Sequence, residues 1–299
     1  MRRLLAVLLA TGAAAGVTVA FAQERVDERR SPPGAGTGAT APRTPSGASL
    51  PAPDAALPRT PARLATALTA TTRRLREALA RWHGSGAVPR DVTYLALHHQ
   101  RILRLMSARR ALGDATLARL PRDVRGEARD TVAARRRLAA IPRSPGRLPR
   151  VRVARAAPAA ALRRHYAAAQ RRFGVPWSVL AAVNFVESAF GRVRSASEAG
   201  ARGPMQFLPS TWRAYGMGGD IDDPRDAILA AANYLRRSGA PRHLDRALYA
   251  YNHSTSYVRA IRRFAARMRA DERSFLTYYA WQVYVRTAAG VRRLTGPGR

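Results

Sequence analysis

The stretch NFVESAFG, residues 184–191, decides the expected fold because it places an acid inside an apolar helix. The apolar residues around it recur at steps of three and four, as on the core-facing side of an α-helix. These residues are Val179, Val183, Val186 and Phe190. The spacing predicts a buried helix over residues 177–190 that ends at Gly191, with Glu187 beside the core-facing stripe.

Because Glu187 lies at the edge of that stripe, we expect its carboxyl group to be half withdrawn from water. Withdrawal from water disfavours the ionised form and raises the pKa of the carboxyl group, as a general acid at neutral pH requires. Taken alone, the same pattern also describes an ordinary surface glutamate that abuts an apolar face. Its interpretation therefore depends on the other polar residues of the chain.

A glycine-bracketed loop follows in EAGARGPMQFLPSTW, residues 198–212. Gly200 and Gly203 enclose a tight turn that can bring backbone close to a ligand. Gln206 offers both a donor and an acceptor for sugar hydroxyl and acetamido groups, and Met205 offers an apolar surface for a sugar ring. As an isolated residue, a methionine such as Met205 is more often a core residue.

A third polar motif ends a predicted helix in ALYAYNHS, residues 247–254. Tyr251 supplies a flat ring with a polar tip, and Asn252 supplies an amide, both suited to carbohydrate. Tyr251 alone is also typical of a core. Together with Glu187 and the glycine-bracketed loop, however, the two residues favour a carbohydrate site.

The chain divides into five expected segments. Residues 1–22 resemble an export signal, either cleaved or retained as an anchor, because Arg2 and Arg3 precede an apolar run and a small-x-small site. Residues 23–61 form a Pro/Gly/Ala-rich linker that buries too little apolar surface to order itself. A helical region of unknown role follows at 62–141, a basic linker at 142–155, and a catalytic domain at 156–299. The chain lacks cysteine, which excludes disulfides and thiolate metal sites.

Helical periodicity predicts three helices before the basic linker and six after it. Those expected before the linker span 62–82, 91–112 and 117–141, and those after it span 156–173, 177–190, 209–215, 224–237, 244–251 and 255–269. After Glu272, an aromatic and β-branched run followed by Ala-Ala-Gly predicts a short hairpin. We therefore expect a mainly α protein with a short C-terminal β-hairpin.

Two patterns suggest metal ligands but have better explanations. DIDDPRD, residues 220–226, begins like a calcium loop, yet Arg225 replaces the glycine and Ala231 the glutamate that such a loop requires. Asp223 followed by Pro224 instead predicts a helix N-cap. The adjacent His98 and His99 point to different faces of a helix, which disfavours shared ligation. We expect no metal site and no cofactor.

The formal net charge is +33, and all 52 basic residues are arginine. A field of this sign attracts polyanions, including nucleic acid, anionic lipid and acidic wall polymers. Twelve arginines and no acid lie between Thr131 and Val186. Such a run is either a solvated basic hinge or a contact with an anionic surface. It lacks the interleaved aromatic residues of many nucleic-acid readers, so we expect no nucleic-acid partner.

Together, Glu187-Ser188, the GARGPMQ stretch and Ala250-Tyr251-Asn252 resemble the lytic transglycosylase family, whose SLT domain is similar to goose-type lysozyme. The likeness is nearest to the membrane-bound lytic transglycosylase B-like branch and covers residues 156–284. It implies a lysozyme-like fold, with Glu187 as the catalytic acid and base. It further implies substrate contacts at Ser188, Gly203, Met205, Gln206, Tyr251 and Asn252. Many relatives have leucine where this chain has Pro204.

The resemblance implies a lyase of murein, secreted or associated with the cell envelope, that acts as a monomer on peptidoglycan strands. With one obvious carboxylate, we expect the acetamido group of N-acetylmuramic acid to act as the second group. Cleavage of its β-1,4 bond to N-acetylglucosamine would then leave a 1,6-anhydro-muramyl end. Two alternatives stay open: a hydrolytic muramidase on the same fold, and a non-catalytic wall-binding protein. Arginine-rich segments would add contacts to anionic wall polymers or a membrane surface.

Overall fold

The computed structural model describes residues 43, 47, 49–142, 151–287 and 290–298. These residues form eleven α-helices and one two-stranded antiparallel hairpin, which confirms the expected mainly helical class with a C-terminal hairpin. The expected export signal, residues 1–22, lies outside the described residues. None of the described helices is both long and apolar enough to cross a bilayer.

Four helices precede the expected basic linker. They are α1 (Pro61–Trp82), α2 (Arg90–Ala108), α3 (Arg110–Arg119) and α4 (Arg122–Ala139). The single helix expected over 91–112 is broken at Arg109, whose backbone is extended. α3 packs so closely on α2 that a Cβ on Gly113 would lie 2.1 Å from the carbonyl oxygen of Met106. This tertiary contact has no local sequence signal, which is why periodicity alone predicted one helix.

Seven helices follow, and six of them lie where helical periodicity predicted a helix. They are α5 (Ala159–Phe173), α6 (Trp177–Ser188), α7 (Pro209–Tyr215), α8 (Pro224–Arg237), α9 (Leu244–Tyr251), α10 (Thr255–Ala270) and α11 (Arg273–Tyr279). The predicted N-cap of α8 is confirmed, because the Asp223 carboxylate accepts from the backbone N–H groups of Arg225 and Asp226. No group of three or more potential metal-ligating side chains occurs among the described residues.

The hairpin joins β1 (Tyr284–Thr287) to β2 (Gly290–Arg293), with Tyr284 opposite Arg293. The aromatic run that predicted it begins earlier, and its first part forms α11 instead. Phe275 and Tyr278 lie three residues apart and are both buried, so helical backbone brings both rings to the core. Phe275 packs edge-on against Phe190 with ring centroids 5.4 Å apart.

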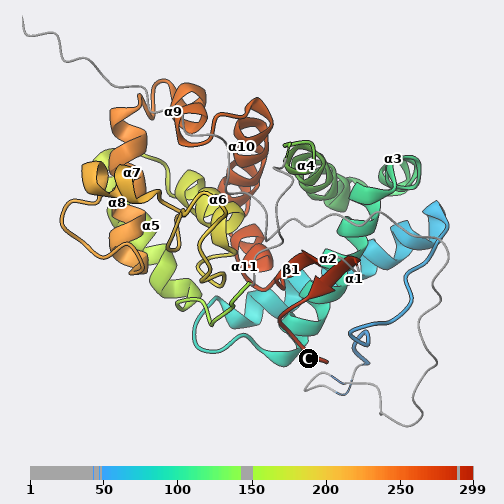
Figure 1. Ribbon diagram of the computed structural model, residues 1–299. Coiled ribbons are helices and arrows are strands. Elements are labelled where there is room, and N and C mark those ends of the chain that lie inside the picture. The colour runs from blue at the N-terminus through green and yellow to red at the C-terminus, as the bar shows by residue number, and fades with distance from the viewer. Residues whose placement is uncertain (1–42, 44–46, 48, 143–150, 288–289, 299) are drawn as a thin grey trace, which may run out of the picture.

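One cluster of buried apolar side chains runs from Leu50 to Val283, through both the N-terminal helices and the expected catalytic domain. Figure 1 shows α6, α10 and α11 between α1–α4 on one side and α5 with α7–α9 on the other. Parts of the two expected linkers also pack against the helices. Leu50 is 2% exposed, and Val153 pairs with Val193 in an isolated β-bridge. Shared apolar burial thus joins segments that composition had separated.

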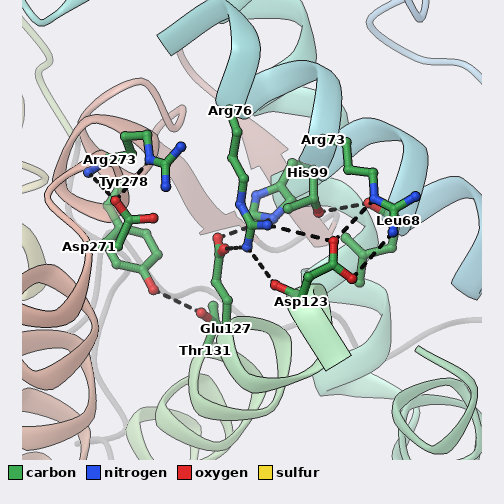
Figure 2. A network of polar contacts seen from close by, with 11 residues as sticks. Leu68, Arg73, Arg76, His99, Asp123, Glu127, Thr131, Asp271, Arg273 and Tyr278 are labelled. Carbon is green, nitrogen blue, oxygen red and sulfur yellow. Dashed lines mark hydrogen bonds and ion pairs between the residues drawn. The ribbon is translucent and has the colours of Figure 1, made fainter. Parts of the chain in front are cut away.

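Polar contacts cross the same boundary (Figure 2). Thr131 of α4 and Tyr278 of α11 share a hydrogen bond of 2.8 Å between two buried hydroxyl groups. Beside it, Arg76 of α1 donates to the buried carboxylate of Glu127 at 2.9 Å. The network therefore ties α1 and α4 to the C-terminal half of the chain.

We expect the Thr131–Tyr278 hydrogen bond to couple the two halves energetically. Thr131→Val or Tyr278→Phe alone leaves one buried hydroxyl without its partner, which should lower the free energy of unfolding by about 1–2 kcal/mol. The double variant should cost less than the sum of the two single changes, since neither hydroxyl then remains. Chemical denaturation measures all three values. Thr66→Val, which removes a hydrogen bond within α1 alone, is the control; strictly additive costs would contradict the coupling.

Candidate active site

Glu187 lies in the last turn of α6 and is more deeply buried than its sequence pattern suggested. It is 5% exposed, whereas we expected a carboxyl group half withdrawn from water. Nearly every residue of α6 is buried, because other helices pack around the whole circumference rather than against one stripe. Burial raises the pKa of Glu187 to about 7, and a hydrogen bond from Tyr257 partly opposes this rise.

Tyr257 is the direct partner of the Glu187 carboxyl group, and α10 supplies it. Its fully buried hydroxyl group donates to Oε1 of Glu187 at 2.7 Å. A donor favours the ionised carboxylate, but the loss of solvation has the larger effect on the pKa. The result is a carboxyl group that exists in both protonation states near neutral pH, as general acid–base chemistry requires.

Tyr251 lies close enough to Glu187 to be affected by its charge. The pKa of the Tyr251 hydroxyl is raised well above its ordinary value, first by burial and then by the negative charge of Glu187. This hydroxyl group donates to the carbonyl oxygen of Met205 at 2.6 Å. The structure therefore brings the third sequence motif beside the acid and ties it to the glycine-bracketed loop.

Ser188 holds that loop against α6 and is itself fully buried. Its hydroxyl group donates to the carbonyl oxygen of Pro204 and accepts from the backbone N–H of Gly191 at 2.8 Å. The amide of Asn184 donates to the same carbonyl oxygen at 2.7 Å. Ser188 is thus placed to hold the backbone at Pro204 and at Gly191 rather than to touch a ligand.

The glycine-bracketed loop forms a tight turn that its sequence explains. Arg202 and Phe207 form an isolated β-bridge, and Gly203 between them has a φ of 74°. A Cβ at this position would lie 1.9 Å from the carbonyl oxygen of Ile221, so both conformation and space require glycine here. Gln206 also has a left-handed backbone, with a φ of 50°, and its side-chain amide donates back to Gly203 at 3.0 Å.

The placement of Met205 differs from the sequence expectation. Its side chain is 0% exposed and belongs to the apolar core, so it offers no surface to a sugar ring in this structure. A loop has no regular spacing of apolar residues, so the sequence could not predict that the Met205 side chain faces the core. The backbone carbonyl of Met205, which accepts from Tyr251, is the part that contributes to the site.

Asn252 follows Tyr251 at the end of α9 and is 9% exposed. Its side-chain oxygen Oδ1 is buried, and no described residue donates a hydrogen bond to it. A buried acceptor without a partner is costly unless something else satisfies it. The Oδ1 atom of Asn252 is therefore available to accept a hydrogen bond from a ligand.

Two residues of the site were given no role by the sequence, Tyr257 and Asn184. Tyr257 is three residues beyond Ser254, which caps α10, and this position in the first turn directs it toward α6. Its proximity in sequence to Tyr251-Asn252 is the signal that could have identified it. Asn184 lies one helical turn before Ser188, so the sequence shows that the two side chains share a helix face. It does not show that the Asn184 amide binds the carbonyl oxygen of Pro204.

The other acids near the site motifs have structural partners or face solvent. Glu198 is exposed, Asp222 forms an ion pair with Arg202 at 2.8 Å, and Asp223 caps α8. Burial raises the pKa of Glu187 and the hydrogen bond from Tyr257 lowers it, and no second carboxylate of the described chain contributes to the shift. The site is therefore built around a single acid.

Comparisons with known proteins agree with this geometry. Residues 165–273 match the family described as the Transglycosylase SLT domain. Over 122 residues, the chain is 32% identical to the membrane-bound lytic murein transglycosylase F of Thiobacillus denitrificans. This match covers 38% of the chain and 26% of the relative, so the chain spans about a quarter of the relative's length. No solved structure was found to match. The segment that holds Glu187, the glycine-bracketed loop and the Tyr251-Asn252 motif is therefore the part of the chain that matches the Transglycosylase SLT domain.

Proposed function

We propose that the protein is a peptidoglycan lytic transglycosylase that uses Glu187 as its single acid and base. The substrate bond is the β-1,4 link between N-acetylmuramic acid and N-acetylglucosamine. The observation that supports this best is the buried carboxyl group of Glu187, whose pKa of about 7 lets it both donate and accept a proton near neutral pH. The SLT domain around it supports the choice of substrate.

In the first step, Glu187 donates its proton to the bridging oxygen of the glycosidic bond. The bond between that oxygen and the anomeric carbon of N-acetylmuramic acid breaks, and the leaving sugar departs with a neutral hydroxyl group. Positive charge develops at the anomeric carbon. Because the site holds no second carboxylate within the described chain, the carbonyl oxygen of the substrate's own acetamido group bonds to this carbon.

In the second step, the ionised Glu187 accepts the proton of the 6-hydroxyl group of the same sugar. The 6-oxygen attacks the anomeric carbon, displaces the acetamido oxygen and closes the 1,6-anhydro ring. Glu187 is again protonated, so the cycle balances without water. The hydroxyl group of Tyr257 keeps a hydrogen bond to Oε1 available throughout, which stabilises the carboxylate between the two steps.

The substrate contacts follow from which polar groups remain available. The side chain of Gln206 is half-buried at the turn of the loop, and the Oδ1 atom of Asn252 lacks a protein donor among the described residues. We assign Asn252 to accept the N–H of an acetamido group, and Gln206 and Tyr251 to contact sugar hydroxyl groups. Ser188 and Gly203 act through the loop that they position, and Met205 acts through its backbone.

We place the protein outside the cytoplasm, secreted or associated with the cell envelope, where its substrate lies. The expected signal over residues 1–22 supports this location. Residues 49–141 belong to the same working unit as the SLT domain, because they share its core. We infer that this unit acts as a monomer.

Replacement of Glu187 by glutamine should abolish turnover of purified peptidoglycan while glycan binding persists, because the amide cannot donate the proton. Mass spectrometry of the wild-type digest should find muramyl ends that are lighter by one water than hydrolytic ends. Glu198→Gln, which alters an exposed acid, should leave both product and rate unchanged. Hydrated ends would identify a hydrolytic muramidase instead, and undigested peptidoglycan would identify a wall-binding protein.

Replacement of Tyr257 by phenylalanine should raise the pKa of Glu187 further above about 7, because the hydrogen bond from Tyr257 favours the ionised form. The first step needs protonated Glu187, so kcat/KM should fall at a higher pH in the variant than in the wild type. A pH profile of peptidoglycan cleavage measures the shift. Tyr249→Phe, on the exposed side of α9, serves as the control; a shift toward lower pH after Tyr257→Phe would refute this role.

The same pKa predicts a pH dependence of stability. Glu187 has an ordinary pKa of 4.5 in the unfolded chain and about 7 in the folded protein, so the folded state binds the proton more tightly. Its contribution is fully present below pH 4.5 and is lost as the pH rises through about 7, amounting to about 3 kcal/mol. The free energy of unfolding of Glu187→Gln, minus that of the wild type, should therefore be more favourable to the variant at pH 8 than at pH 4. Chemical denaturation at both pH values measures this difference. An equal difference at both values would contradict the raised pKa.

A further inference from the structure

α10 presents a row of arginines on the side that faces away from the core. The row consists of Arg259, Arg262, Arg263 and Arg269, all exposed, and is called here the basic face of α10. Steps of three, four and seven residues place such side chains on one side of a helix. The opposite side is buried, and the helix sequence contains no acid.

Nearby acids neutralise only half of this face within the described chain. Arg262 lies 3.4 Å from Asp245 of α9, and Arg263 lies 3.0 Å from Asp130 of α4. Four arginines against two aspartates leave two positive charges on the face. Arg259 and Arg269 have no acidic partner among the residues that the structure describes.

The helix dipole does not account for the row. A cation is stabilised by the dipole only near the C-terminal end of a helix, and the effect fades within one turn. Arg269 lies in the last turn of α10, but Arg259 lies in its second turn, where a cation gains nothing from the dipole. The shared position of these arginines on one face gives this side of α10 a surface that suits an anionic partner.

The basic face lies on the same helix as part of the candidate active site. Tyr257, which donates to Glu187, is two residues before Arg259, so the two side chains lie on opposite sides of α10, about 3 Å apart along its axis and about 10 Å apart across it. The ion pair between Arg262 and Asp245 also joins the face to α9, which carries Tyr251. From Arg259, the face extends about 15 Å along the axis to Arg269. A polymer held at Glu187 therefore has a basic surface within reach of its neighbouring units.

We propose that the basic face of α10 binds the carboxylates of the stem peptides on the peptidoglycan that Glu187 cleaves. This inference rests on the proposed function. Stem peptides branch from the muramic acid residues and carry free carboxylates, so the substrate presents separate anions at intervals along its length. Guanidinium groups bind carboxylates through paired hydrogen bonds, and arginines spread over three turns suit several separate anions. The outward side of α10 carries no aromatic residue, unlike most readers of nucleic acid.

The test compares two pairs of charge reversals that change the net charge equally. Arg259→Glu with Arg269→Glu alters the basic face. Arg63→Glu with Arg171→Glu alters exposed arginines in the first turn of α1 and the last turn of α5. Each pair is combined with Glu187→Gln, so that binding is measured without digestion. Retention on insoluble peptidoglycan, freed of teichoic acid, is measured over a range of NaCl concentrations, before and after enzymatic removal of the stem peptides.

The proposal expects the reversal on α10 to weaken retention on intact peptidoglycan about tenfold, since two favourable ion pairs become repulsive. The effect should shrink as salt screens the charges. Removal of the stem peptides should lower the retention of the parent protein and abolish the difference between parent and variant. The control pair should bind as the parent does. With Glu187 intact, the α10 variant should cleave peptide-free glycan chains at the parent rate and form the same ends.

Four results would overturn the proposal. The control pair could weaken retention as much, which would mean that bulk charge alone matters. The loss could persist on peptide-stripped glycan, which would place the contact on the sugars. Retention could be unchanged on both materials, or the α10 pair could reduce binding to duplex DNA while retention on peptidoglycan stays the same. Absence of anhydro ends from the parent enzyme is a separate result, because it rejects the proposed reaction and leaves the binding comparison readable.

Discussion

The burial of one carboxyl group in the last turn of α6 is the constraint on which the site depends. α6 is surrounded by other helices, and desolvation raises the pKa of Glu187 further than the hydrogen bond from Tyr257 lowers it. That balance requires close packing at the end of α6. Ser188 and Asn184 provide it by holding the carbonyl oxygen of Pro204, which brings the glycine-bracketed loop against the helix.

The N-terminal helices contribute to this site through α10. α10 packs against α6 on one side and α4 on the other, so the position of Tyr257 depends on α4 although α4 contains no residue of the site. Arg263 and Asp130 join α10 to α4, and Figure 2 shows further contacts that join α4 to α1 and α11. A helical region to which the sequence assigned no role therefore packs against α10, the helix that supplies the partner of Glu187, the proposed catalytic acid.

Local signals predicted much of this structure, and tertiary contacts decided the rest. The ends of α7 and α8 follow from the proline at the start of each helix, from Asp223 before α8 and from Gly216 after α7. The three polar motifs could be grouped because each combines side chains suited to a sugar. Burial could not be predicted in the same way. The full enclosure of α6, the inward orientation of Met205 and the partnership of Tyr257 with Glu187 depend on helices far apart in the sequence. Periodicity describes one helix at a time and does not reveal such contacts.

Two glutamates are buried among the described residues, and their partners differ in charge. Glu127 faces the guanidinium group of Arg76 at 2.9 Å, an ion pair that suits a fixed anion within a network between helices. Glu187 faces the neutral hydroxyl group of Tyr257 instead. Although the chain has 52 arginines, none of those in the described residues lowers the pKa of Glu187. An arginine in that position would favour the carboxylate and remove the proton that glycosidic cleavage requires. The proposed chemistry therefore requires that no cation lies beside the Glu187 carboxyl group, as well as requiring the carboxyl group itself.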